Sequence, residues 1–221
     1  MKQLADDVWH VPSRLGRWNI NAYVLGDVLV DALTRHDAKR ILGRLDGHAI
    51  TAHALTHVHA DHQGSSNAVC EALGVPFWVG ERDADAAERP ELIRERMPSH
   101  PVPRLFYRAF VGPGRPADRR LREGDEVAGF RVLETPGHTR GHLAFWRDSD
   151  RTLVLGDVLT NMDVITTIPG LRETKTYFNE ESAENNRSAK RLAELEPALV
   201  LFGHGAPLRD PRKLSDFCAR L

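Results

Sequence analysis

Residues 56–64, THVHADHQG, place four side chains that can bind a metal ion within six positions. They are His57, His59, Asp61 and His62. Protonated histidines so close together would repel one another, whereas neutral imidazole and carboxylate are ligands that divalent cations take from proteins. In an extended turn, side chains two positions apart can reach one ion, and Asp61 and His62 can reach a second. The run therefore predicts a metal site and favours two neighbouring ions over one.

Each of these ions needs further ligands, and three distant segments offer them. His138 lies in PGHTRGH, Asp157 in TLVLGDV and His204 in ALVLFGHG. Each of the three follows an apolar run and has a glycine beside it. Side chains that follow strands can meet at one edge of a sheet. A carboxylate such as Asp157 also has two oxygens with which it could bridge two ions.

Alternating strands and helices must position these side chains. Apolar and alternating runs predict strands at residues 8–12, 20–25, 28–33, 49–56, 75–80, 126–136, 142–148, 152–158 and 198–205. Amphipathic patterns predict helices at 37–47, 65–74, 84–96, 179–196 and 212–221, with Asn179 as the N-cap of the fourth. The alternation indicates a layered α/β sandwich with helices outside the sheets, and it leaves open whether one sheet or two lie in the centre.

Two segments between these elements look irregular. Residues 81–120 hold six of the 13 prolines, and after the helix at 84–96 they predict an extended excursion. Residues 160–178 predict a second excursion. The part at 97–113, with its prolines and aromatic residues, could roof an apolar pocket. Tyr107 and Tyr177 could donate a hydrogen bond to an oxyanion, with packing as the competing interpretation.

Size and composition set further limits. With 221 residues, 41% of them hydrophobic, the chain suits one domain spanning residues 1–221. A net charge of −1 gives no electrostatic footprint for nucleic acid or an anionic membrane, and no apolar run approaches the roughly 20 residues of a membrane-spanning helix. Cys70 and Cys218 form no CxxC pair, so we expect free thiols and, by default, the cytoplasm. The oligomeric state stays unknown.

In this order along the chain, HVHADH, PGHTRGH, LGDV and FGHG resemble the motif signature of the metallo-β-lactamase superfamily, with Asp31 in LVDAL as the first motif. The resemblance covers about residues 8–207 and points to the branch of glyoxalase II and the lactonases. It implies an α+β fold, the αββα four-layer sandwich, in which two mixed β-sheets carry helices on their outer faces. It also implies a binuclear metal site at one edge, with two zinc ions as the usual occupants and iron or manganese as alternatives.

The resemblance also implies a role for each site residue. One metal ion would be held by His57, His59 and His138, and the other by Asp61, His62 and His204. Asp157 and a hydroxide would bridge the two ions, and Asp61 would be the catalytic residue that orients the hydroxide. Asp31 and His142 would support the ligands without touching a metal. The family often has Asp-Thr-Gly where this chain has Asp31-Ala32-Leu33, which leaves the conformation of this turn open.

The implied activity is hydrolysis of a small-molecule ester, lactone or thioester by the metal-bridging hydroxide, with no serine or cysteine nucleophile. Zinc β-lactamases with HxHxDH generally lack the bridging aspartate, so Asp157 leaves β-lactamase activity as a minor alternative. Hydroxyacylglutathione hydrolases use a C-terminal helical extension that is missing after His204, and lactonases carry a tyrosine where this chain has Thr160 and Asn161. The substrate-binding residues are therefore unassigned.

Two other functions remain open. Relatives with this signature include persulfide dioxygenases that hold a single iron at the positions of His57, His59 and His138. A metal-binding scaffold without activity is the third alternative, although a complete ligand set argues against it. Metal content and oxygen consumption would separate the dioxygenase from a hydrolase with two zinc ions.

Overall fold

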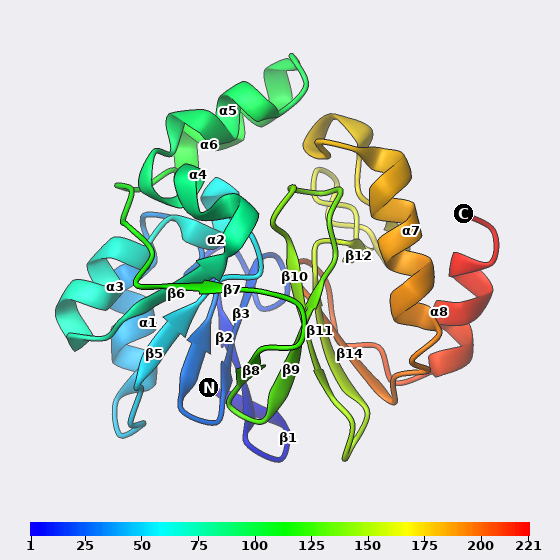
Figure 1. The fold of residues 1–221 in the computed structure, drawn as a ribbon, viewed down its shortest axis with the longest axis horizontal. Coiled ribbons are helices and arrows are strands. Elements are labelled where there is room, and N and C mark those ends of the chain that lie inside the picture. The colour runs from blue at the N-terminus through cyan, green and yellow to red at the C-terminus, as the bar shows by residue number, and fades with distance from the viewer.

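The computed structural model describes all 221 residues, and its strands form two facing β-sheets (Figure 1). The first sheet has seven strands in sequence order: β1 (Lys2–Ala5), β2 (Val8–Pro12), β3 (Asn21–Leu25), β4 (Val28–Val30), β5 (Ala52–Ala54), β6 (Phe77–Gly80) and β7 (Arg119–Leu121). Neighbouring strands are antiparallel from β1 to β4 and parallel from β4 to β7. The sheet is therefore mixed, with helical connections wherever its strands run parallel.

The second sheet has five strands in the order β14-β11-β10-β9-β8. They are β8 (Glu126–Val127), β9 (Phe130–Glu134), β10 (Leu143–Arg147), β11 (Thr152–Gly156) and β14 (Leu199–Phe202). β11 and β14 are parallel, and the other neighbours are antiparallel. A separate antiparallel hairpin joins β12 (Leu159–Met162) to β13 (Pro169–Glu173).

A buried core of 16 residues lies between the two sheets. Successive side chains of a strand point to opposite faces, so each strand contributes every second residue to this core. In β10, Leu143 and Phe145 belong to the core between the sheets, while Ala144 and Trp146 belong to a separate core on the outer face. The regular alternation explains how apolar strands can pack on both sides at once.

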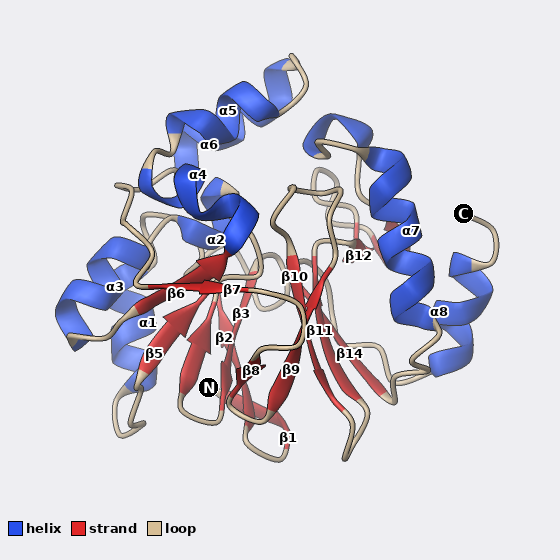
Figure 2. Cartoon of the chain, in the orientation of Figure 1, coloured by secondary structure: helices blue, strands red, loops and turns tan.

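Helices cover the outer face of each sheet (Figure 2). On the first sheet, α1 (Ala38–Leu45), α3 (Ser66–Leu73), α4 (Ala84–Glu88) and α5 (Glu91–Arg96) bury apolar residues against the strands. On the second sheet, α7 (Ser182–Ala193) and α8 (Pro211–Cys218) do the same. The result is the four-layer αββα arrangement, which confirms the predicted fold class. None of the helices is both long enough and apolar enough to cross a membrane.

Several predictions about local structure were wrong. The helix expected at 84–96 is interrupted at Arg89–Pro90 and forms α4 and α5, and the second excursion, at 160–178, holds most of the β12–β13 hairpin. Much of the excursion expected at 97–113 is a helix, α6 (Pro101–Phe110), which begins with a proline in its first turn and a hydrogen bond from the Val102 N–H to His100. Proline at this position is a helix-start signal because the missing N–H would be unpaired anyway. The helix predicted from Asn179 begins later, at Ser182, so Asn179 is not its N-cap.

Candidate metal centre

The strands deliver the predicted site residues to one edge of the sandwich. β9, β11 and β14 point in the same direction, because β9 and β11 are both antiparallel to β10, and β14 is parallel to β11. His138, Asp157 and His204 follow the carboxyl ends of these three strands. Asp31 follows β4 directly, and the run from His57 follows the parallel strand β5.

The structure brings six of the seven predicted ligands into two neighbouring groups, and the seventh, Asp157, lies between them. In the first group, one ligand atom from each of His57, His59 and His138 lies within 4.8 Å of the others, and all three side chains are buried. His59 Nδ1 and His138 Nε2 are 2.8 Å apart. The second group, Asp61, His62 and His204, meets the same limit. Asp61 and His62 of this group come from the four-residue helix α2 (Ala60–Gln63). The two groups adjoin at His62, whose ring centroid is 4.2 Å from that of His57, and His57, His62 and Asp157 form a third set within the same limit.

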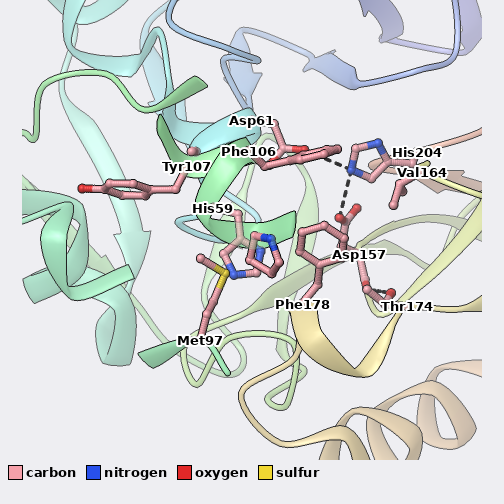
Figure 3. A pocket seen from close by; sticks show the side chains of 12 residues that line it. His59, Asp61, Met97, Phe106, Tyr107, Asp157, Val164, Thr174, Phe178 and His204 are labelled. Carbon is pink, nitrogen blue, oxygen red and sulfur yellow. Dashed lines mark hydrogen bonds and ion pairs between the residues drawn. The ribbon is translucent and has the colours of Figure 1, made fainter. Parts of the chain in front are cut away.

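Asp157 lies between the two groups, as Figure 3 shows for its approach to His204. Its Oδ2 atom is 3.6 Å from His138 Nε2 in the first group. The same oxygen is 3.6 Å from His62 Nε2 and 3.1 Å from His204 Nε2 in the second group. One carboxylate oxygen is thus within reach of both groups, which is the arrangement that a bridging ligand requires.

Four of the ligand histidines are held by the ring nitrogen that faces away from this centre. In each of them Nδ1 is hydrogen-bonded to an oxygen: His57 to Thr56 Oγ1 at 3.0 Å, His62 to Asp31 Oδ2 at 2.9 Å, His138 to Asn179 Oδ1 at 2.8 Å and His204 to the Asn19 carbonyl at 2.5 Å. These oxygens accept, so Nδ1 carries a proton and Nε2 is the nitrogen that faces the centre and could bind a metal. Such partners orient metal-binding histidines and fix their tautomer.

Three buried atoms of these residues have no hydrogen-bond partner in the protein. His57 Nε2, His62 Nε2 and Asp157 Oδ1 are buried and form no hydrogen bond. A buried polar atom without a partner costs about 1–3 kcal/mol, so several of them facing one point call for a ligand. Neutral imidazole nitrogens together with carboxylates are a donor set that suits divalent cations such as zinc. The residues present therefore fit a pair of divalent ions.

Burial and the carboxylates push the histidine pKa values in opposite directions. Burial lowers the pKa of His57 and of His59 well below the usual value. Burial also acts on His204, but Asp157 and Asp61 outweigh it and raise the pKa of His204 to about 10. The pKa of His62 is raised well above the usual value in the same way, by Asp157, Asp31 and Asp61 against burial. A cation that binds to the second group must displace these protons.

Asp31 and His142 hold the ligands from outside. Asp31 accepts hydrogen bonds from His62 and from both the N–H and the hydroxyl of Thr56. His142 Nε2 accepts the backbone N–H of Asp157 at 3.1 Å, and its Nδ1 is 2.7 Å from Thr135 Oγ1. No sequence signal marks Thr56 or Asn179 as partners of the ligands, because a threonine or asparagine in a loop is unremarkable without its neighbours.

Gly203 leaves room for two of these side chains. A Cβ atom at this position would overlap Asp157 Oδ1 and lie 2.7 Å from His62 Cε1. Only glycine therefore fits directly after β14, because any side chain there would collide with Asp157 and His62. The motif Gly203-His204-Gly205 thus combines a ligand with the space that its neighbours need.

A pocket opens above the metal centre, between α6 and the loops that follow β12 and β13 (Figure 3). Its floor holds His59, Asp61, Asp157 and His204, and its other walls are Ala60, Met97, Pro103, Phe106, Tyr107, Val164, Thr174 and Phe178. Phe106 and Phe178 meet with ring centroids 5.5 Å apart, joining the two excursions over the pocket. All charged side chains in the lining belong to the candidate metal groups, so the rest of the pocket is uncharged.

Neither tyrosine considered for an oxyanion is placed for that role. The Tyr107 hydroxyl points away from the floor residues in Figure 3. The Tyr177 ring stacks on His100, with centroids 4.1 Å apart and planes 3° from parallel. Both contribute to the walls and packing of the roof.

Comparison with known proteins agrees with this geometry. A family model described as the metallo-beta-lactamase superfamily matches residues 15–204. The chain is 30% identical over 200 residues to "Probable metallo-hydrolase YflN" of Bacillus subtilis (strain 168), covering 82% of this chain and 73% of that protein. It is also similar to an N-acyl homoserine lactonase of Bacillus sp (28% over 152 residues, 67% of this chain and 53% of that one). A hydroxyacylglutathione hydrolase of Bdellovibrio bacteriovorus is 26% identical over 157 residues, covering 69% and 48%.

Solved structures give the same result. The metallo-beta-lactamase family protein TTHA1429 from Thermus thermophilus superposes with a TM-score of 0.71 at 26% identity, covering 99% of this chain and 80% of that one. TTHA1623, solved in a di-iron-bound form, has a TM-score of 0.63 at 27% identity, covering 91% and 88%. By family model, sequence identity and fold, this chain is a member of the metallo-beta-lactamase superfamily of metallo-hydrolases.

Proposed function

We propose that this chain is a hydrolase that works with two divalent metal ions on a small ester, lactone or thioester. The observation that carries the proposal is the position of Asp157 Oδ2, within 3.6 Å of nitrogens from both ligand groups. His57, His59 and His138 would hold one ion, Asp61, His62 and His204 would hold the other, and Asp157 would contact both. When bound, such a pair of ions supplies a hydroxide at neutral pH and polarises the carbonyl oxygen of the substrate.

The protein's own groups would do the rest. Asp61 borders the pocket and lies 3.3 Å from His204 Nε2. The catalytic role that we propose for its carboxylate is to orient an attacking water and to accept a proton from it. Asp31, Thr56, Asn179 and His142 would keep the ligands in one orientation, so that little rearrangement is needed during reaction.

The pocket supports an apolar substrate. Met97, Phe106, Val164 and Phe178 line it, and no charged side chain is available outside the metal groups. The peptide part of a glutathione thioester carries several charges that this pocket would leave unpaired, at a cost in binding. An uncharged acyl ester or lactone fits better, as the similarity to a lactonase also suggests. The chain spans about half the length of the lactonase and of the glutathione hydrolase, so neither whole-protein activity transfers directly.

Zinc is the metal that we propose, with iron as the alternative because TTHA1623 was solved with two irons. A dioxygenase with a single iron needs only the first ligand group. The second group is equally complete here, with two buried histidines and Asp61. This supports the hydrolase over the dioxygenase.

A panel of chromogenic esters, lactones, thioesters and β-lactams tests the proposal. We expect turnover of an apolar ester or lactone that is lost after chelation and restored by added zinc or iron, with no consumption of oxygen. His59→Ala should abolish this turnover while the fold is kept, and His48→Ala, at an exposed position away from the site, should not. Turnover that survives chelation or the His59 change would refute the proposal.

A further inference from the structure

Five basic side chains line a groove that shares no residue with the pocket over the metal centre. They come from three parts of the chain: Lys2 from β1, Arg14 and Arg17 from the loop between β2 and β3, and Arg40 and Arg44 from α1. The remaining lining includes His10, Pro12, Ser13 and Gly16, and no aspartate or glutamate. We call these five cations and His10 the basic groove.

The charges of the basic groove are not balanced within the protein. The chain as a whole has 30 basic and 31 acidic residues, and many of its arginines form ion pairs. None of the five groove cations lies within 4.0 Å of a carboxylate oxygen. Arg40 and Arg44 are one helical turn apart, where like charges destabilise a helix. Arg40 Nε donates a hydrogen bond to the Pro12 carbonyl, but no carboxylate neutralises any of the five cations. Like charges that no carboxylate balances point to an anion from outside.

His10 gives a second, independent indication of a ligand. Its side chain is buried, with 1% of its surface exposed, yet it forms part of the groove wall. Asn21 donates to the carbonyls of Phe202 and Gly205, so its Oδ1 must accept the hydrogen of His10 Nε2, at 2.8 Å. His10 Nδ1 is then a hydrogen-bond acceptor, and it forms no hydrogen bond within the protein.

The neighbours of His10 keep it in this form. Burial, with help from Arg17 and Lys2, lowers the pKa of His10 to about 4, so the ring is neutral near pH 7. The ring also stacks on Trp18, with centroids 4.3 Å apart. A fixed, neutral acceptor among five cations suits a group that is anionic and still carries a hydrogen.

We propose that the basic groove binds a small phosphate ester or oligophosphate. Guanidinium groups match pairs of phosphate oxygens with charge-assisted hydrogen bonds. A singly protonated phosphate can also donate its hydrogen to His10 Nδ1, whereas sulfate has no hydrogen to give near neutral pH. The concave shape favours a compact ligand over an extended nucleic acid. This proposal does not depend on the proposed hydrolase activity.

The basic groove adjoins the metal centre through one loop. The Asn19 carbonyl is bonded to His204 Nδ1, and the Trp18 carbonyl accepts the N–H of Gly205. In the same loop, Arg17 lines the groove and Trp18 stacks on His10 in the groove wall. A phosphate that draws on Arg17 would therefore act on the segment that holds His204.

Calorimetric titration of the metal-loaded protein with ADP tests the proposal. We expect Arg40→Gln/Arg44→Gln to weaken ADP binding about 10-fold or more, because two charge-assisted contacts are lost. Arg187→Gln/Lys190→Gln on α7 removes the same charge from exposed positions without ion pairs and should leave the affinity unchanged. Arg17→Gln should weaken binding in the same direction from outside the helix. Sulfate at equal concentration should compete poorly.

Several results would overturn the proposal. The proposal fails if the parent protein does not bind ADP, or if the parent and the α1 double variant bind ADP equally. It also fails if the α1 and α7 double variants lose the same affinity for ADP. Binding of a single-stranded oligonucleotide through the same arginines, without binding of ADP, would assign the groove to nucleic acid instead. Thermal unfolding of each variant shows whether a loss of binding comes from a loss of fold, and Arg17→Gln decides the matter if the α1 variant unfolds.

Discussion

His142 Nε2 accepts the backbone N–H of Asp157 at 3.1 Å, so a histidine outside the ligand groups fixes the carboxylate that lies between them. The His142 ring is fully buried and is itself held through Nδ1 by Thr135. The ring thus connects the loop of His138 to the end of β11. A metal ion held by Asp157 would therefore depend on a residue that belongs to neither ligand group.

Replacing His142 should therefore weaken metal binding. We expect His142→Ala to lower metal affinity, and turnover with it, by about 10- to 100-fold, which is typical when a partner of a metal ligand is lost. Competition with a chromogenic chelator measures the affinity. His48→Ala serves as the control, because His48 is exposed and its ring contacts Trp9, which belongs to neither ligand group. An unchanged affinity in the His142 variant would show that Asp157 is held without this bond.

Adding a single methyl group at Gly203 should disrupt the centre. In Gly203→Ala the new Cβ would overlap Asp157 Oδ1 and press on His62, so we expect the loss of most metal binding. Gly43→Ala is the matched control, because it adds the same group in helix α1 with no atom within 4 Å. That change should stabilise the fold by up to about 1 kcal/mol. Full metal occupancy in Gly203→Ala would show that Asp157 and His62 do not need the space that glycine leaves.

Asp83 should make the stability of the fold depend on pH. This buried carboxyl accepts hydrogen bonds from Thr139 and Gly141, in the loop of His138, and burial raises its pKa to about 7. A raised pKa means that the folded state favours the protonated form, so its contribution is complete below about pH 4 and is lost as pH rises through 7. Asp83→Asn cannot lose this proton. The free energy of unfolding of the variant, relative to the parent, should rise by up to about 4 kcal/mol between pH 4 and pH 8.

Urea unfolding of both proteins across this pH range measures that difference. Groups that titrate in both proteins cancel, so the difference isolates Asp83. A constant difference from pH 4 to pH 8 would show that Asp83 is ionised throughout this range. Arg96, whose Nη1 lies 3.9 Å from the carboxylate, would then be the charge that stabilises it.

Phe106 should select for the length of the acyl group. It lines the pocket and contacts Phe178 across it, so Phe106→Ala removes apolar contact with a bound chain. We expect kcat/KM for a hexanoyl ester to fall by about 10- to 100-fold, mainly through KM, with a much smaller effect on an acetyl ester. Leu105→Ala is the control, because this neighbouring residue in α6 is 67% exposed and lies outside the pocket. Equal losses for both esters would mean that Phe106 acts on the fold of the roof.

The sequence alone could predict much of this architecture, because the chemically distinctive residues sit directly after apolar runs. Strand ends at one edge of a sandwich must come close together, so His138, Asp157 and His204 could be connected to the run at 57–62 from spacing and motif order. The contacts around them could not be predicted. Asn179 looked like a helix cap, and only the tertiary fold brings it to His138.

Leu33 shows how packing can override a local preference. It stands where the family often has glycine, and the chain keeps a left-handed conformation there, with φ of 55°. This backbone costs a leucine about 1–2 kcal/mol. Its fully buried side chain packs in the core under α1 and α3, and burial of a leucine is worth about 1.5–3 kcal/mol. The turn therefore survives without glycine, an outcome that depends on tertiary contacts and not on the local sequence.

The number of metal ions per chain, measured by elemental analysis after zinc saturation and removal of excess metal, is the most direct test of a two-ion centre. A centre built on His57, His59 and His138 on one side and Asp61, His62 and His204 on the other predicts about two ions in the parent protein. Asp61→Ala/His204→Ala should retain about one. A parent protein that holds a single ion, and holds it unchanged in this double variant, would contradict the two-ion centre.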